Sequence, residues 1–443
     1  MIDPEERLWA GGGSLLAGGP YTWHITDFDQ RRHFSVTYSP AAPVQDVEET
    51  EDICLAKLRK HVDDLGADVL GIRFSDPDGP ITVSTDEKDD VTWYVNCHPL
   101  SALKLPFPVK TILVGSLTEL DRLGPQVDLV TYRGDPTVNG VADKTKAAFK
   151  YWFIANGMFR KWYELQCWSR LPRDHPHIVP LDAVVLDNAR GGVVGFTSLY
   201  VPGGTLRDSA VTRPFRLAWL QQLLSVVDDL NYRYGIMHQD IAARNLLIND
   251  KENLCIFDFN FSVMIKEHYT PDRDDYKGVV FTLYEIITLD EHFRQVPHAE
   301  QDAEALLRLE WVKHPDVKLD SHVQAFRQVL DTWLTDRRRR EFKLVDTCIQ
   351  WPWMPQEPPA PVLAKGPDGA VAGTEMRSSV PVLIRAELVQ MNEPFFKWER
   401  PASYRLKDLR EKNDSQRDIF TCRLAKSQLR SETAASLEED CER

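Results

Sequence analysis

The first part of the chain alternates apolar and polar residues in short runs, a period typical of half-buried strands. Residues 51–66 instead repeat apolar positions at helical spacing, and we expect this helix to end at Gly66. The strands expected around it are residues 33–40, 67–75, 81–84 and 91–98. Residues 1–115 therefore predict a small α/β accessory domain, and a protein-interaction or regulatory surface is a hypothesis from its position alone. Three of its histidines lack the paired spacing of metal ligands: His24, His33 and His98.

Beyond residue 115 the pattern changes from strands to helices. Residues 116–124, 126–133 and 146–154 predict three strands, and we interpret the polar segment 133–140 as a hairpin connection. Helical spacing of apolar residues follows over 216–236, 272–288 and 323–336. A strand-rich part is thus followed by a helical part.

Residues 236–260 carry the candidate chemistry. Asp240 and Asn245 lie in a polar interruption between apolar segments, and Asp258 follows thirteen residues after Asn245. Two short strands joined by a turn at 249–250 would bring these side chains together. Mg²⁺ takes oxygen ligands and usually combines one or two protein carboxylates with substrate phosphates. The spacing favours phosphoryl transfer from a Mg-nucleotide, with Asn245 and Asp258 as metal ligands and Asp240 at an acceptor hydroxyl.

This segment resembles the protein-kinase-like fold, with HQD (238–240) in place of HRD and DFN (258–260) in place of DFG. The resemblance covers about residues 115–350, and this part of the sequence is similar in particular to a group of fungal kinase-like proteins. It implies that Lys150 holds the phosphates of ATP and that Glu164 pairs with Lys150. The turn at 175–179 would follow the helix of Glu164. The resemblance also implies these nucleotide-binding positions: Gly124 and Val130 in the first strands, Ser198 as gatekeeper, and Leu199, Tyr200 and Val201 as hinge.

The fold class predicted is α+β, a bilobal protein-kinase-like fold with a β-rich N-lobe and a helical C-lobe behind a small α/β domain. The boundaries expected are 1–115 for the accessory domain, 116–200 for the N-lobe and 201–355 for the C-lobe. Residues 356–443 begin with a Pro/Gly-rich stretch that predicts a linker, followed by a partly disordered tail. Within the tail, aromatic residues at 395–401 are expected to dock on the body as a strand or strap.

The sequence departs from the kinase pattern in informative places. The expected phosphate loop contains a single glycine, Gly124, followed by Pro125, which has no N–H, and by Asp128, which would repel phosphate if it pointed inward. Gln239 replaces the arginine that reads a phosphorylated activation loop, and only seventeen residues separate Asp258 from Asp275. Asn260 replaces a glycine, and we expect it to keep a left-handed backbone there.

Composition narrows the class of protein without choosing a substrate. A net charge of −14 disfavours binding to nucleic acid or anionic membranes. The chain has no run of eighteen apolar residues and no signal sequence at its start, so we expect a cytoplasmic protein. The seven cysteines are scattered, which predicts reduced thiols. The basic run 337–340 is interpreted as a solvated helix end, with a nuclear signal as the sharper alternative.

The function predicted is ATP- and Mg²⁺-dependent phosphoryl transfer to a hydroxyl acceptor, with a protein serine, threonine or tyrosine as the expected acceptor. Three alternatives stay open. The first is a nucleotide-binding pseudokinase that acts as a scaffold, which the altered glycine loop favours. The second is a small-molecule kinase of the aminoglycoside or choline type, which also carries H-x-D-x-x-x-x-N and has no long activation segment. The third is an interaction protein whose working surfaces are the first 110 residues and the tail.

Overall fold

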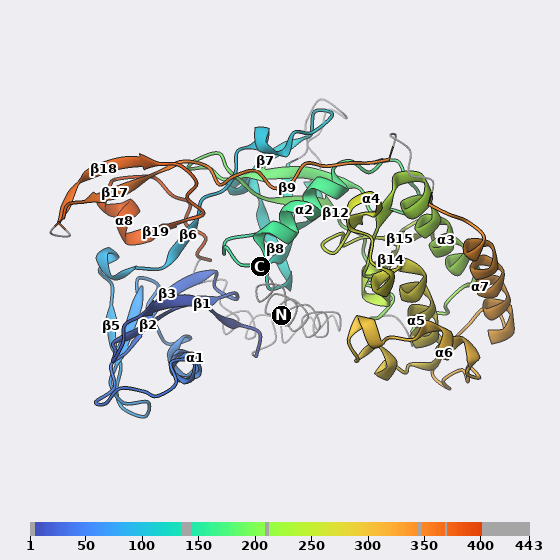
Figure 1. Cartoon of the computed structure of the whole chain (residues 1–443), viewed down its shortest axis with the longest axis horizontal. Helices are drawn as coiled ribbons and strands as arrows, with labels where there is room; N and C mark the ends of the chain where they lie inside the picture. Colours follow the sequence, from blue (N-terminus) through green and yellow to red (C-terminus); the bar gives the residue numbers. More distant parts are fainter. Residues whose placement is uncertain (1–4, 134–143, 209–211, 343–347, 368–369, 401–443) are drawn as a thin grey trace.

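The structure is a computed structural model that describes residues 5–133, 144–208, 212–342, 348–367 and 370–400. The N-terminal sheet and a C-terminal hairpin lie at one end of the long axis (Figure 1). Most of the helices lie at the other end, and a second, larger sheet lies between. The predicted hairpin connection at 133–140 falls largely outside the described residues.

The N-terminal sheet has the strand order β1-β2-β3-β4-β5 and is antiparallel except for the parallel pair β3 and β4. Its elements are β1 (Leu8–Leu15), β2 (Tyr21–Asp27), β3 (Arg32–Tyr38), α1 (Glu49–His61), β4 (Gly71–Phe74) and β5 (Thr82–Ser84). Helix α1 buries Cys54 and Leu58 against this sheet. The predicted helix and the predicted strands of the sheet are confirmed, but β1 and β2 were not predicted. The helix ends at His61 rather than at Gly66, because the chain turns directly after Val62.

The middle sheet has the order β7-β11-β12-β10-β9-β8, in which only β7 and β11 run parallel. Its strands are β7 (Thr111–Leu113), β8 (Thr118–Gly124), β9 (Val127–Arg133), β10 (Lys144–Tyr151), β11 (Leu181–Leu186) and β12 (Val193–Leu199). Helix α2 (Met158–Trp168) connects β10 to the turn before β11. The three strands predicted from residue 116 onward are present. Strand β7 precedes that boundary and still pairs within this sheet.

The helical part is built on α3, on the hairpin of β14 and β15, and on the two-stranded sheet of β13 and β16. Its elements are α3 (Leu217–Asp228), the π-helix η4 (Asp229–Tyr234), β13 (Ile236–Met237), β14 (Leu246–Ile248), β15 (Leu254–Ile256), β16 (Val263–Met264), α4 (Ile265–His268), α5 (Asp275–Thr288), α6 (Ala303–Arg308) and α7 (Val323–Arg338). Short 3₁₀ turns join the elements of the whole chain: η1 (Glu87–Asp89), η2 (Leu100–Leu103), η3 (Val114–Ser116), η5 (Ala243–Asn245), η6 (Pro271–Arg273), η7 (His292–Arg294) and η8 (His298–Glu300). Among the described residues, each helix is too short or too polar to cross a lipid bilayer.

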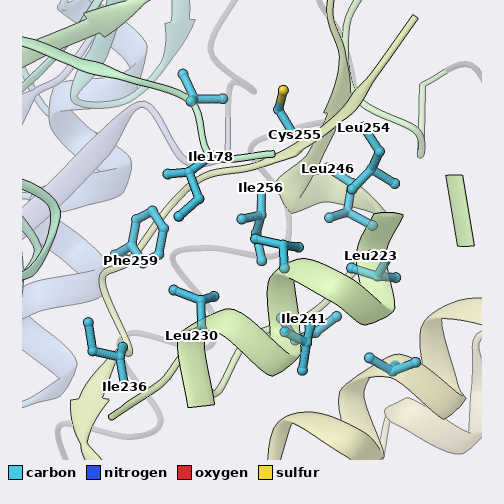
Figure 2. Close-up of a cluster of buried hydrophobic side chains, with 14 of the residues drawn as sticks. Ile178, Leu223, Leu230, Ile236, Ile241, Leu246, Leu254, Cys255, Ile256 and Phe259 are labelled. Atoms are coloured by element: carbon cyan, nitrogen blue, oxygen red, sulfur yellow. The ribbon is translucent and has the colours of Figure 1, made fainter. Parts of the chain in front are cut away.

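The largest apolar core extends from α2 and the middle sheet into the helical part, and it includes the contact between α3 and the hairpin of β14 and β15. Figure 2 shows Leu223 and Leu230 from the helical side facing Leu246, Leu254 and Ile256 from the hairpin. Each of these side chains is buried, and each buried Leu or Ile contributes about 1.5–3 kcal/mol relative to an exposed one. The apolar residues of α3 and η4 therefore fix the position of the hairpin next to the candidate residues.

The segment after residue 356, predicted as a linker, is folded over much of its length. It forms β17 (Ala360–Lys365), β18 (Val371–Arg377), β19 (Val382–Ile384) and α8 (Arg385–Gln390). Strands β17 and β18 form a hairpin, and β19 pairs with β6 (Trp93–Val95) near the N-terminal sheet. Proline and glycine content alone predicted an extended chain here because it ignores these pairings.

The aromatic segment near residue 395 docks on the body as expected. Trp398 is buried and stacks on Tyr151 of β10, with ring centroids 5.4 Å apart. Arg400, of which only 6% is exposed, forms ion pairs with Glu119 and Asp128, both at 2.8 Å. Its guanidinium also donates to the carbonyl oxygens of residues 28 and 29, at 2.9 and 2.6 Å. The strap therefore ties the middle sheet to the N-terminal sheet.

Candidate active site

Lys150 lies near the end of β10, on the face of the middle sheet that is turned toward α2. The antiparallel register places Lys150 opposite Val127 on β9 and opposite Phe196 on β12. Neighbouring residues on a strand point to opposite faces, so Phe149 and Tyr151 enter the aromatic core behind the sheet. The ammonium group is thereby directed away from that core.

Two carboxylates hold the ammonium of Lys150. Its Nζ lies 2.7 Å from Oε2 of Glu164, on α2, and 2.7 Å from Oδ1 of Asp258. Helix α2 packs its apolar face inward through Trp162 and Leu165, which fixes Glu164 in a fully buried position. The resemblance to kinases implied that Glu164 pairs with Lys150 and that Asp258 lies beside them, and the structure brings the three side chains into direct contact.

The charges of this triad are unequal because two buried carboxylates share one cation. Burial raises the pKa of Glu164 to about 8, although Lys150 lowers it in part. Burial also raises the pKa of Asp258, but Lys150 outweighs that effect and holds the Asp258 pKa below its ordinary value. Burial lowers the pKa of Lys150, and the two carboxylates outweigh it, so the net direction is upward. The interactions therefore favour the charged forms of Lys150 and Asp258, and Glu164 is the member of the triad whose pKa is shifted toward neutral pH.

Asp240 and Asn245 lie together in the turn before β14. The Nδ2 of Asn245 donates to the backbone oxygen of Asp240 at 2.9 Å and to its Oδ2 at 2.7 Å. Arg244 forms an ion pair with Oδ1 of the same carboxylate. Burial lowers the pKa of Arg244, but the neighbouring carboxylate of Asp240 outweighs this effect, so the net direction is upward. The predicted pairing of strands 246–248 and 254–256 is confirmed, and it brings Phe257 N–H to the carbonyl of Asn245 at 3.2 Å.

Asp275, to which the sequence assigned no role, holds the backbone of the turn that carries Asp240. Its carboxylate is buried and accepts the backbone N–H of His238 at 2.9 Å and of Gln239 at 2.7 Å. It also accepts the side-chain amide of Asn231 at 2.7 Å. Gln239 has a φ of 63°, which L residues adopt at a cost of about 1–2 kcal/mol. The carboxylate offsets this strain by accepting the N–H groups of His238 and Gln239, so Asp275 positions the backbone just before Asp240.

His238 supports the loop as predicted. It is fully buried, its Nε2 lies 3.2 Å from the carbonyl oxygen of Phe257, and its ring packs on Phe259 with centroids 5.1 Å apart. The expectation for Asn260 is wrong. The residue with positive φ in this motif is Asp258, at 66°, and Asn260 is absent from the described residues of positive φ. The bend that aims Asp258 at Lys150 is therefore made by Asp258 itself.

The positions implied for the nucleotide base and phosphates divide between the two faces of the sheet. Ser198 pairs with Ala148 and shares the face of Lys150, while Leu199 ends β12 and is followed by Tyr200 and Val201 outside the strand. The backbone N–H of Val201 has no acceptor among the described residues. Val130 differs from expectation: it lies in the core behind the sheet with Phe149, so alternation along β9 puts Leu129 on the face of Lys150 instead.

The segment that replaces the glycine loop is a tight turn. Gly124 pairs with Val127, which leaves only Pro125 and Gln126 at the tip, and the carbonyl oxygen of Gln126 accepts the N–H of Tyr151 at 3.0 Å. Asp128 points to the rear face, where Arg400 holds it at 2.8 Å. The repulsion expected from an inward Asp128 is thus removed, although a long phosphate-wrapping loop is absent from this hairpin.

The side-chain oxygens of Asn245 and Asp258 could bind Mg²⁺ only together with phosphate oxygens. Asn245 uses Nδ2 to hold Asp240, and no described group hydrogen-bonds its Oδ1, so an amide oxygen is the atom left for a metal. Asp258 adds a carboxylate. The described residues contain no group of three or more His, Cys, Asp or Glu side chains that could hold a metal by themselves. Mg²⁺ commonly needs just one or two protein ligands beside substrate phosphates.

Comparison with known proteins agrees with this geometry. The family model for protein tyrosine and serine/threonine kinases matches residues 156–295. This segment matches the protein kinase family. It contains Glu164, Asp240, Asn245, Asp258 and Asp275, whereas Lys150 lies just before it. The match covers less than half of the chain.

Curated relatives are serine/threonine kinases that share short segments. The chain is 34% identical over 94 residues to the CBL-interacting serine/threonine-protein kinase 2 of Arabidopsis thaliana, which is 20% of each protein. It is 34% identical over 101 residues to the serine/threonine-protein kinase US3 of human herpesvirus 1 (strain 17), covering 21% of this chain and 20% of the relative. The chain thus spans about a fifth of the length of these relatives.

Proposed function

We propose that this protein is an ATP-dependent phosphotransferase with a bilobal kinase-like core, which transfers the γ-phosphoryl group to a hydroxyl acceptor. The observation that carries the proposal is the triad in which Lys150 Nζ lies 2.7 Å from both Glu164 and Asp258. A cation fixed between two carboxylates from different elements is the arrangement that positions nucleotide phosphates and their metal.

The residues divide the work by their chemistry. Lys150, steadied by Glu164, would bind phosphate oxygens, and the oxygens of Asn245 and Asp258 would hold Mg²⁺. Asp240 would accept the proton of the attacking hydroxyl, with its carboxylate oriented by Asn245 and Arg244. When bound, Mg-ATP would supply the phosphoryl group, and its Mg²⁺ would offset part of the negative charge of the phosphates. These side chains contribute positioning and electrostatic stabilisation.

The acceptor is proposed to be a protein serine, threonine or tyrosine hydroxyl, in a cytoplasmic setting. Similarity to serine/threonine kinases supports a protein acceptor. The tight turn at Pro125 and Gln126 instead favours a protein that binds nucleotide without turnover, and the same experiment separates these two functions.

The test is incubation of the full chain with [γ-³²P]ATP and Mg²⁺, with generic protein acceptors and a panel of hydroxyl metabolites. Asp240→Asn keeps the size of the side chain and removes its basicity, so we expect transfer to fall at least about a hundredfold, in the range of general-base contributions. Asp250→Asn, in the exposed turn between β14 and β15, is the matched control and should keep wild-type transfer. ATP binding without transfer to any acceptor would favour the pseudokinase. Equal transfer by Asp240→Asn and wild type would refute the assignment of Asp240.

A further inference from the structure

A cavity lies outside the triad, between the N-terminal sheet and the start of α2. Its volume is about 550 Å³, within the range of about 300–1,000 Å³ typical of small-molecule sites. One wall comes from β1, β2 and β3, a second from β6, and a third from residues 154–160. Three separate parts of the chain thus converge on it.

The walls are aromatic, and glycine places two of the rings. Trp9, Trp93 and Phe159 line the cavity. A Cβ on Gly11 would lie 2.4 Å from the ring of Trp9, so this indole lies directly over glycine backbone. A Cβ on Gly12, whose φ is +118°, would lie 3.2 Å from the ring of Trp93. The glycine run therefore builds flat apolar surfaces that suit a planar ligand.

The polar groups of the cavity include buried atoms with no partner among the described residues. Both ring nitrogens of His24 are buried and unbonded, and the ring packs edge-on against Trp93 at 5.4 Å. His33 faces the same space and shares a hydrogen bond with Thr26 at 3.2 Å. Burial lowers the pKa of His24 to about 4 and the pKa of His33 well below its ordinary value. At neutral pH both imidazoles are therefore uncharged, and each offers one donor and one acceptor.

Arg160 supplies the only formal charge among the lining residues. Its Nη1 is buried with no hydrogen-bond partner, and no carboxylate lines the cavity to neutralise it. The guanidinium lies over the rings of Phe159 and Phe261, 5.7 and 5.1 Å from their centroids. A guanidinium held in this way presents a planar donor fork that matches a carboxylate.

We propose that this cavity binds a planar aromatic small molecule that carries one carboxylate, with its ring between the indole walls and its carboxylate on Arg160. The neutral imidazole of His24 gives a further hydrogen bond to the ligand. An unpaired buried donor costs free energy that a matching acceptor recovers, so the ligand gains from both the cation and the histidine.

The site also has a path to the candidate active site. Arg160 lies one helical turn before Glu164 on α2, and Phe261 lies three residues after Asp258. A ligand bound to Arg160 would therefore lie one helical turn from Glu164 and next to the segment that follows Asp258. Any effect of this proximity on phosphoryl transfer rests on the proposed function, whereas binding to the cavity does not.

The test is isothermal titration of the full chain, without ATP, with 2-naphthoate and with its neutral analogue 2-naphthamide. We expect 2-naphthoate to bind wild type with a sub-millimolar Kd and at least tenfold more tightly than the amide. In Arg160→Met the preference for the carboxylate should be lost. Arg216→Met is the matched control, because Arg216 also stacks on an aromatic ring, that of Trp219, but lies in the helical part. This control should keep wild-type binding.

A second variant covers the case in which Arg160→Met does not fold. Asn156→Trp places a large ring at an exposed position of the cavity wall and leaves Arg160 unchanged, so it should weaken 2-naphthoate binding at least tenfold. The proposal is overturned if wild type does not bind 2-naphthoate at millimolar concentration. It is also overturned if naphthoate binding persists in both Arg160→Met and Asn156→Trp. Because ATP is absent, this result is independent of phosphoryl transfer.

Discussion

Substitution of Asp275 tests how the turn that carries Asp240 is held. Its Oδ1 accepts the N–H of Gln239, and its Oδ2 accepts both the N–H of His238 and the amide of Asn231. Asp275→Ala leaves all three donors buried without this acceptor. Asp275→Asn keeps one oxygen, which can still serve His238 and Asn231, but it sets an NH₂ group against the N–H of Gln239.

The magnitude follows from the number of donors affected. A buried donor left without a partner costs about 1–3 kcal/mol. We therefore expect Asp275→Asn to lower the free energy of unfolding by about 1–3 kcal/mol. Asp275→Ala should cost about 3–5 kcal/mol, because three donors are affected and solvent or relaxation recovers part of the loss. Burial raises the pKa of Asp275, and the hydrogen bonds from these donors lower it in part.

The assay is urea denaturation at neutral pH, followed by phosphoryl transfer measured well below the unfolding midpoint. Once Gln239 is no longer held at a φ of 63°, the turn that carries Asp240 should relax. Transfer should then fall even where the protein is fully folded. Asp272→Asn, at an exposed position three residues earlier, should stay within about 0.5 kcal/mol of wild type. An unfolding free energy and a transfer rate of Asp275→Asn equal to those of wild type would show that the reasoning is wrong.

Three further predictions concern other buried charges. Because the folded-state pKa of Glu164 is about 8 and its ordinary value is 4.5, the folded state binds the extra proton, and stability should fall as pH rises from about 4.5 to 8. Glu164→Gln should flatten the pH dependence of the urea midpoint over that window, whereas the control Glu304→Gln should keep the slope of wild type. The same slope in all three proteins would contradict this prediction. Arg400→Met should lower the free energy of unfolding, measured by urea denaturation, by about 3–5 kcal/mol, since it leaves Asp128 and Glu119 without their main cation. Arg377→Met removes an exposed ion pair and should lower it by under about 0.5 kcal/mol. Equal losses in the two variants would refute the role of Arg400 in holding the strap. Lys150→Met should abolish phosphoryl transfer in the radiolabel assay, because no other cation contacts both Glu164 and Asp258 among the described residues; wild-type transfer in this variant would remove Lys150 from the site.

The residues of the candidate site could be predicted from the sequence more completely than the residues that hold them in place. The spacing of Asp240, Asn245 and Asp258 around an apolar hairpin was enough to predict that they lie together, since the turn and the pairing are local. Asp275 could not be assigned in this way, because its partners are backbone N–H groups 36 and 37 residues earlier in the chain. An aspartate at the start of a helix is ordinarily interpreted as a cap.

The outer parts of the fold were harder to predict for the same reason. Strand β1 contains a run of glycines, which have no strand propensity, and its pairing with β2 decides its conformation. The strap was expected to dock, but the contacts of Arg400 with Asp128 and with the N-terminal sheet join residues more than 270 positions apart. Local patterns report burial and period, and they do not identify such distant partners.

The most direct test of the account is isothermal titration of Mg-ATP into wild type and into Asp258→Ala. The account predicts saturable binding to wild type that depends on Mg²⁺ and is at least tenfold weaker in Asp258→Ala, because the carboxylate beside Lys150 would hold the metal. Absence of binding to wild type, or the same affinity in both proteins, would contradict the central claim that Lys150, Asn245 and Asp258 form a nucleotide site.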